Sequence, residues 1–180
     1  MPVATEQKVW TLAELHSLPD DGNKYELIHG ELFVTPPPVP EHEDVAARLT
    51  RLIDPFVAAN DLGFVYHPRS VVRYRKSEVE PDLIVRKPWT GRRRKWEDAP
   101  IPILVVEILS PYTRRRDHEQ KREFYMEVGV EEYWIADPEA HSILVVRQDE
   151  EDRLERETLT WSPSSAQSSL TIRLSDVFES

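Results

Sequence analysis

Residues 103–109 read ILVVEIL, an apolar run with one carboxylate inside it. A nearly continuous apolar run of this length is typical of a strand buried on both faces of a sheet. Because side chains alternate between the two faces of a strand, Glu107 shares its face with Val105 and Leu109. Burying a carboxylate there is costly unless it is paired or bound to a cation. The run therefore predicts a buried central strand and marks Glu107 as a candidate functional residue.

The remaining elements are predicted from turn signals and hydrophobic periodicity. A hairpin is expected at 24–35, with its turn at His29-Gly30. Further strands are expected at 64–75, 81–86, 131–138 and 141–148, followed by a strand pair and a short helical turn within 154–178. Helices are expected at 11–18, 41–60 and 117–128, the last opened by Asp117 and closed by Gly129. We expect a single domain over residues 1–180, of the α/β (α+β) class.

Composition excludes several kinds of protein. The 180 residues include no cysteine, which excludes disulfides, thiolate metal sites and a cysteine nucleophile. No apolar run approaches the roughly 20 residues of a membrane span, and the first ten residues lack the features of a signal peptide. We therefore expect a cytoplasmic protein without a membrane partner. The six histidines lack zinc-site spacing, and the five glycines form no phosphate-binding loop.

The charge is distributed unevenly along the chain. The net charge is −10, yet residues 69–122 hold 15 of the 23 Lys and Arg and only 8 of the 33 Asp and Glu. A polyanion meets the local field, because salt screens charges beyond roughly 8–10 Å. Two basic runs could bind a phosphate backbone or form a solvated surface: Arg92, Arg93, Arg94 and Lys95, and Arg114, Arg115 and Arg116. Trp89 and Trp96 flank the first run and could stack on unpaired bases or cover a core edge.

Asp82 is the natural partner of Glu107. It opens the strand before the ILVVEIL run, so the two carboxylates converge if these strands are neighbours. Paired hard oxygen ligands are what Mg²⁺ or Mn²⁺ requires. Two simpler roles compete with this one. Asp82 could cap a turn after Pro81, and Glu107 could pair with a buried arginine.

The motifs around these carboxylates occur together in one family. They are PDLIVR, VVEILSP, a following helix with Asp117 and Lys121, VEEYWIADP, and an opening YELIHGEL that is followed by prolines and His42. Between about residues 24 and 147 the chain resembles the Uma-two family of "putative restriction endonucleases", within the PD-(D/E)xK nuclease superfamily. The resemblance implies a restriction-endonuclease-like core, in which helices flank a mixed central sheet, with an N-terminal β-hairpin.

The resemblance also implies a chemistry. A Mg²⁺ or Mn²⁺ ion held by Asp82, Glu107 and the Ile108 carbonyl would activate water to cut a phosphodiester of DNA, with RNA as the alternative substrate. The superfamily pattern places a lysine two residues after the acidic residue, where this chain has Leu109. The resemblance suggests that Lys121 takes this role. Lys121 shares a helical stripe with Phe124 and Val128, which should face the sheet, so its ammonium could reach the site. It could equally be an ordinary lysine whose ammonium reaches water.

Three further points stay open in the sequence. Glu31 is a fourth candidate catalytic residue, and Glu26 competes with it because strand register alone does not choose between them. His42 could bind phosphate or cap its helix. The main alternative to a nuclease is a nuclease-fold protein that binds nucleic acid or protein without cutting. A homodimer or larger homo-oligomer, joined through a strand edge, is a third interpretation.

Overall fold

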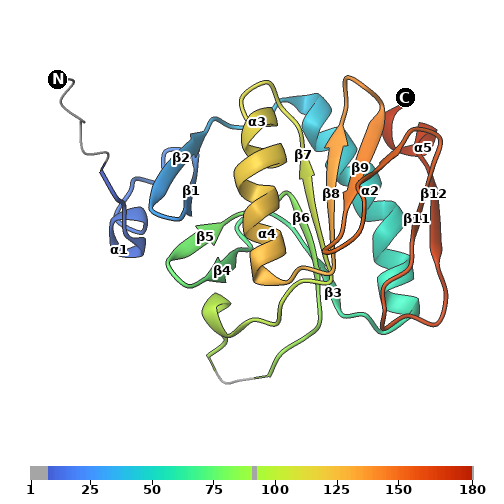
Figure 1. Cartoon of the computed structure of the whole chain (residues 1–180), viewed down its shortest axis with the longest axis horizontal. Helices are drawn as coiled ribbons and strands as arrows, with labels where there is room; N and C mark the ends of the chain where they lie inside the picture. The colour runs from blue at the N-terminus through green and yellow to red at the C-terminus, as the bar shows by residue number, and fades with distance from the viewer. Residues whose placement is uncertain (1–7, 91–92, 180) are drawn as a thin grey trace.

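The computed structural model describes residues 8–90 and 93–179. Its centre is a six-stranded sheet of order β10-β9-β8-β7-β6-β3 (Figure 1). The strands are β3 (Phe64–Tyr66), β6 (Leu83–Arg86), β7 (Leu104–Ile108), β8 (Glu132–Asp137), β9 (Ser142–Val146) and β10 (Arg153–Glu155). β7 and β8 pair in parallel, whereas the other neighbours are antiparallel. The expected mixed central sheet is confirmed.

One face of this sheet is covered by the long helix α2 (Pro40–Ala59). Val45, Leu49 and Ile53 lie at four-residue spacing and pack into the core beneath the sheet, as the periodicity predicts. The helix continues through Pro55 to its last turn. The C-terminal hairpin and the last helix complete this layer; they are β11 (Thr158–Trp161), β12 (Leu170–Arg173) and α5 (Ser175–Phe178).

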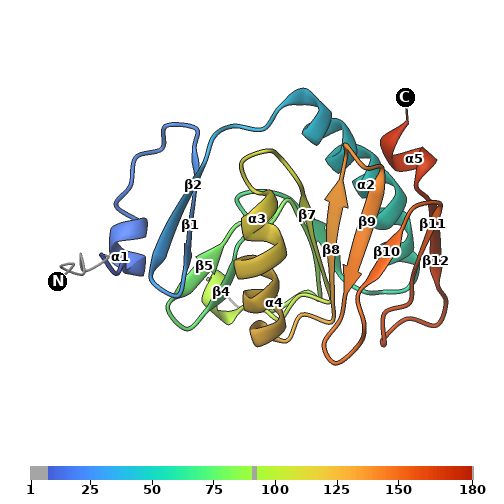
Figure 2. The same cartoon turned by 45° about the horizontal axis from the view of Figure 1, so that its top comes forward.

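The opposite face is covered by a helical segment in three parts (Figure 2). These are α3 (Arg114–Arg116), the π-helical turn η2 (Asp117–Lys121) and α4 (Arg122–Val128). The expectation that Asp117 opens the helix is wrong. Its backbone N–H already donates to the Thr113 carbonyl at 2.9 Å, so Asp117 lies inside the helical segment. Gly129 closes the segment as expected, with a left-handed φ of 86° that a residue without a Cβ adopts freely.

A second, four-stranded sheet of order β2-β1-β5-β4 lies beside this helical segment in both views (Figures 1 and 2). Its strands are β1 (Lys24–Ile28), β2 (Glu31–Thr35), β4 (Val72–Tyr74) and β5 (Ser77–Val79). The predicted hairpin is therefore present, and the predicted strand region 64–75 divides between two sheets. The short α1 (Leu12–Leu15) and the 3-10 turn η1 (Trp96–Asp98) complete the elements. None of the helices in the described ranges is long and apolar enough to cross a membrane.

The antiparallel pairing of β6 with β7 decides where functional residues meet. The start of β6 lies beside the end of β7, so Asp82 and Glu107 fall at the same end of the sheet. The connection between these strands, residues 87–103, leaves from the opposite end (Figure 1).

Candidate active site

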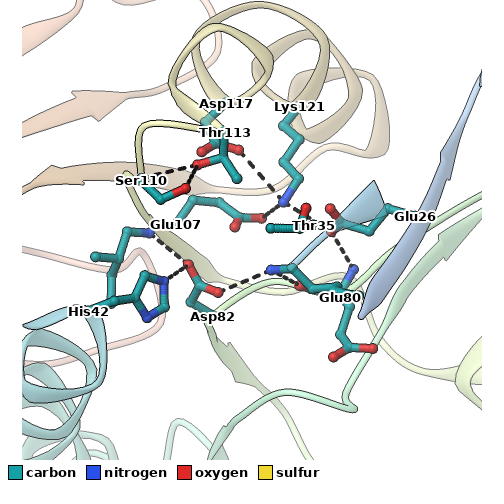
Figure 3. A network of polar contacts seen from close by, with 12 residues as sticks. Glu26, Thr35, His42, Glu80, Asp82, Glu107, Ser110, Thr113, Asp117 and Lys121 are labelled. Carbon is teal, nitrogen blue, oxygen red and sulfur yellow. Dashed lines mark hydrogen bonds and ion pairs between the residues drawn. The ribbon is translucent and has the colours of Figure 1, made fainter. Parts of the chain in front are cut away.

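Asp82 and Glu107 lie side by side on neighbouring strands. Leu83 pairs with Val106 in antiparallel strands. Asp82, one residue before Leu83, therefore lies opposite Glu107, one residue after Val106, and the two carboxylates share one face of the sheet. Both are almost fully buried. Both also line a pocket of about 420 Å³, and Figure 3 shows the polar network around them. The predicted convergence of the two carboxylates is confirmed.

Asp82 accepts hydrogen bonds from three different elements. Its Oδ1 lies 3.2 Å from Lys24 Nζ, and its Oδ2 lies 3.1 Å from His42 Nε2 and 2.8 Å from the Ile108 backbone nitrogen (Figure 3). Burial alone would raise the pKa of this carboxyl, but Lys24 and His42 outweigh it and hold the pKa far below its ordinary value. Asp82 is therefore ionised at neutral pH, and it ties together β1, α2 and β7.

Glu107 has a different environment. Its Oε1 accepts hydrogen bonds from Lys121 Nζ at 2.7 Å and from the Tyr125 hydroxyl at 2.5 Å. Burial, together with the nearby carboxylates of Asp82 and Asp117, raises its pKa to about 7 despite the lysine. Its Oε2 accepts none of the hydrogen bonds formed within the described residues. The buried cation beside Glu107 is a lysine, so the interpretation that it pairs with an arginine is wrong.

Lys121 is fully buried and faces the sheet, as its helical stripe predicts. Besides Glu107, its ammonium lies 3.0 Å from Glu26 Oε1 and 3.7 Å from Asp117 Oδ1. Although burial lowers the pKa of Lys121, these carboxylates raise it above its ordinary value. The side chain is not among those that line the pocket, because Glu107 lies between them. Lys121 thus contacts the pocket wall from behind.

Glu26, and not Glu31, belongs to this network. The hairpin register pairs Glu26 with Phe33 and Glu31 with Ile28, so both carboxylates are on one face, but Glu31 lies two pairs further toward the turn. There it is exposed, whereas Glu26 is buried against Lys121. Burial would raise the pKa of Glu26, but Lys121 and Lys24 lower it to about 2. Of the two residues that the sequence left open, the structure places Glu26 in the network and Glu31 outside it.

His42 is the third residue of α2, whose N-cap is Val39, and no side chain caps this helix. The capping interpretation is therefore wrong, because the ring instead contacts Asp82 in the lining of the pocket. Phosphate binding by His42 stays a prediction. Burial disfavours the charged ring, but the bond to Asp82 raises the pKa of His42 above its ordinary value.

Four residues of the site were missed in the sequence: Lys24, Tyr125, Asp117 in its buried position, and Arg116 as a buried cation. Arg116 donates to Thr35 Oγ1 at 2.8 Å and lies 3.4 Å from Glu26 Oε2. Both Asp117 oxygens are buried without a hydrogen-bond partner among the described residues. The alternation of Lys24 with Glu26 in one strand is the signal that could have placed the lysine in the network.

In the second basic run, Arg114 and Arg115 form ion pairs with acidic side chains. Arg114 pairs with Asp137 at 2.6 Å, and Arg115 pairs with Glu119 at 2.9 Å. Arg116 is buried, and each of the three arginines pairs with a different acid, so they form no continuous basic surface.

The first basic run lies away from the carboxylates. Arg93, Arg94 and Lys95 belong to the connection at the opposite end of the sheet, and Arg92 falls outside the described residues. Lys95 pairs with Glu97 at 3.0 Å. Trp89 and Trp96 pack against each other with ring centroids 5.6 Å apart, and both contact Tyr66. This packing favours the interpretation that these rings cover a core edge.

The residues at the pocket fit a hard divalent cation by donor type. No group of three or more His, Asp or Glu side chains in the described parts of the chain is arranged as a metal centre. Asp82 and Glu107 still offer carboxylate oxygens on one wall of a pocket, which are the ligands that Mg²⁺ and Mn²⁺ prefer. The raised pKa of Glu107 means that additional positive charge beside it would be stabilising. The Ile108 carbonyl stays a predicted third ligand.

A mixed sheet between helical layers, with paired carboxylates and a buried lysine at one end, defines a nuclease-like α/β protein. The model of the Uma2 family, described as "Putative restriction endonuclease", matches residues 12–175, and the chain belongs to this family. A crystal structure described as a "putative nuclease belonging to DUF820" from Anabaena variabilis has a TM-score of 0.77 and 22% sequence identity. The match covers 94% of this chain and 97% of that one. No curated protein matches. The predicted fold class is confirmed, and the family supports a nuclease.

Proposed function

We propose that this protein is a Mg²⁺- or Mn²⁺-dependent endonuclease that hydrolyses phosphodiester bonds of DNA. The observation that carries the proposal is the position of Asp82 and Glu107 on one pocket wall, with Lys121 Nζ 2.7 Å from Glu107. Membership of a restriction endonuclease family supports the same activity.

Asp82 and Glu107 would hold the cation. Once bound, it would neutralise phosphate charge and lower the pKa of an attacking water. Asp82 is prepared for this role, because Lys24 and His42 keep it ionised and the Ile108 N–H fixes its orientation. Lys24 also donates to the Glu80 carbonyl at 3.0 Å, so the ammonium stays near the pocket if it releases Asp82.

Lys121 would act on this wall in two ways. It holds Glu107 in place, and its fixed positive charge lies close to where negative charge develops on the phosphate. Because the geometry is set by Glu26 and Asp117 before substrate arrives, little reorganisation is needed. His42 at the mouth can donate a proton to, or take one from, a group bound beside Asp82.

The direct test is cleavage of DNA by the purified protein. We expect cleavage with Mg²⁺ or Mn²⁺ that is lost in EDTA and in the variants Asp82→Asn and Glu107→Gln. Calorimetry should show at least about a tenfold loss of Mn²⁺ affinity in each variant, because an amide keeps the shape but not the charge of the ligand. Unchanged Mn²⁺ affinity in both would overturn the metal site. Cleavage of RNA without cleavage of DNA would overturn the proposed substrate.

The variant Lys121→Arg keeps the positive charge and changes the shape of the cationic group, so it tests whether catalysis needs the compact ammonium. A planar guanidinium replaces a compact ammonium in a closed space, so we expect kcat to fall by about tenfold or more while Mn²⁺ still binds. Arg122→Ala is the matched control, because the neighbouring side chain is partly exposed and pairs with Asp152. Binding of DNA without cleavage under all conditions would favour the non-cutting alternative.

A further inference from the structure

The residues that line the pocket are of two kinds. Some are ionic, among them Lys24, Asp82 and Glu107. The apolar lining consists of Pro36, Pro37, Pro38, Val39, Pro68, Pro111 and Tyr112. A phosphate backbone is bound by cations and hydrogen-bond donors, which prolines cannot supply. The apolar lining therefore fits a part of the substrate other than phosphate.

Tyr112 is the most exposed large apolar side chain among the described residues, at 78%. It stands between Pro111 and Thr113 in the short connection from β7 to α3, directly after the strand that carries Glu107. An aromatic ring that is free on its faces is a platform for stacking a nucleobase. The preceding Pro111 has a fixed φ, which restricts the backbone beside Tyr112.

The basic side chains near the pocket are already paired with acidic ones, so few of them are free to bind the phosphates of an intact duplex. Lys24 is bound to Asp82, and Arg69, on the pocket wall, pairs with Asp20 at 3.1 Å. The arginines just after Tyr112 are likewise paired with acids, as described above. Affinity for duplex DNA comes mainly from free Lys and Arg that neutralise phosphates. Besides the proposed cation, the described residues around the pocket therefore offer a substrate mainly apolar contact.

We infer that the pocket takes an unpaired DNA segment, with a base stacked on Tyr112 and its phosphate beside the cation that Asp82 and Glu107 would hold. In an intact duplex the bases are stacked on one another, so they cannot contact the apolar lining until they are extruded. This inference rests on the proposed nuclease function and narrows its substrate to single-stranded DNA or to the unpaired part of a duplex.

The test compares one oligonucleotide, alone and annealed to its complement, with Mn²⁺ present. We expect kcat/KM to be at least about tenfold higher for the unpaired strand, because extruding a base costs free energy. Tyr112→Ala should lower kcat/KM for the unpaired strand by about 5- to 150-fold, whereas Tyr112→Phe should retain most of it. Phe64→Ala is the control, since Phe64 is 54% exposed on β3 and pairs with Arg86, at the opposite end of β6 from Asp82.

The outcomes distinguish the inference from the function on which it rests. Equal or faster cleavage of the duplex, or Tyr112→Ala cleaving like the wild type, would overturn the inference and leave the nuclease intact. A protein that cuts neither oligonucleotide and does not bind Mn²⁺ would overturn both. Preference for the unpaired strand that depends on the ring of Tyr112 but not on Phe64 would support it.

Discussion

Lys121 Nζ lies 2.7 Å from Glu107 Oε1, in a buried contact between the helical segment and the central strand β7. The same ammonium serves Glu26 and Asp117, so one cation stabilises three buried carboxyl groups. Because the ammonium is shared, a change of charge at any of these residues should alter the stability of the fold and the pKa values of the others.

Replacing Lys121 with Met removes the ammonium and leaves the three carboxyl groups without it. We expect the free energy of unfolding to fall by on the order of 3–5 kcal/mol at pH 8, as when one partner of a buried ion pair is lost. The loss should be smaller at pH 5, because the carboxyl groups can then take up protons. Urea titrations at both pH values measure it. A loss no larger than that of Arg122→Ala would contradict the shared role of the ammonium.

Glu107→Gln should raise stability in the absence of divalent ions. The folded-state pKa of Glu107, about 7, lies above the unfolded value of about 4.3, so folding favours the protonated form. Stability of the wild type should therefore decrease as pH rises from about 4.3 to about 7. We expect the variant to lack this slope and to gain on the order of 1–3 kcal/mol at pH 8. Thermal unfolding across this pH range checks the sign, and a less stable variant at pH 8 would contradict it.

His42 should titrate above its ordinary pKa of about 6.5. Its pairing with Asp82 stabilises the fold below pH 6.5, and this contribution is lost as pH rises through the raised folded-state pKa. In Asp82→Asn the midpoint should fall, because burial then opposes the charged ring without the Asp82 carboxylate. NMR titration of the ring protons in both proteins measures the two midpoints. An unchanged midpoint would show that the contact is absent in solution.

The double variant Arg93→Ala, Arg94→Ala should leave the active site intact. These residues lie at the far end of the sheet, and salt screens charges beyond about 8–10 Å, so cleavage of a short oligonucleotide should change by less than about twofold. A large loss of kcat at saturating substrate would show that this run reaches the site.

The carboxylate pair was predictable from the sequence, because a strand beginning at Asp82 and a buried strand containing Glu107 have few ways to pair. The orientation of Lys121 followed from its helical stripe. The choice of Glu26 over Glu31 did not follow, because the hairpin register places both on one face and only packing against the helical segment buries one of them. Arg116 was hidden within a run of three arginines, of which one points inward because successive helical residues are about 100° apart.

The polar network joins segments that are distant in the chain, so the candidate active site forms only when these segments have come together. Lys24 and Asp82 are 58 positions apart, and Thr35 and Arg116 are 81 apart. Contacts between such distant positions form only after a large loss of chain entropy, so they are late events in folding. A nascent or partly folded chain holds its carboxylates without the lysines that order them. The proposed cleavage therefore requires complete folding, and we expect partly folded copies of the protein to leave nucleic acid uncut.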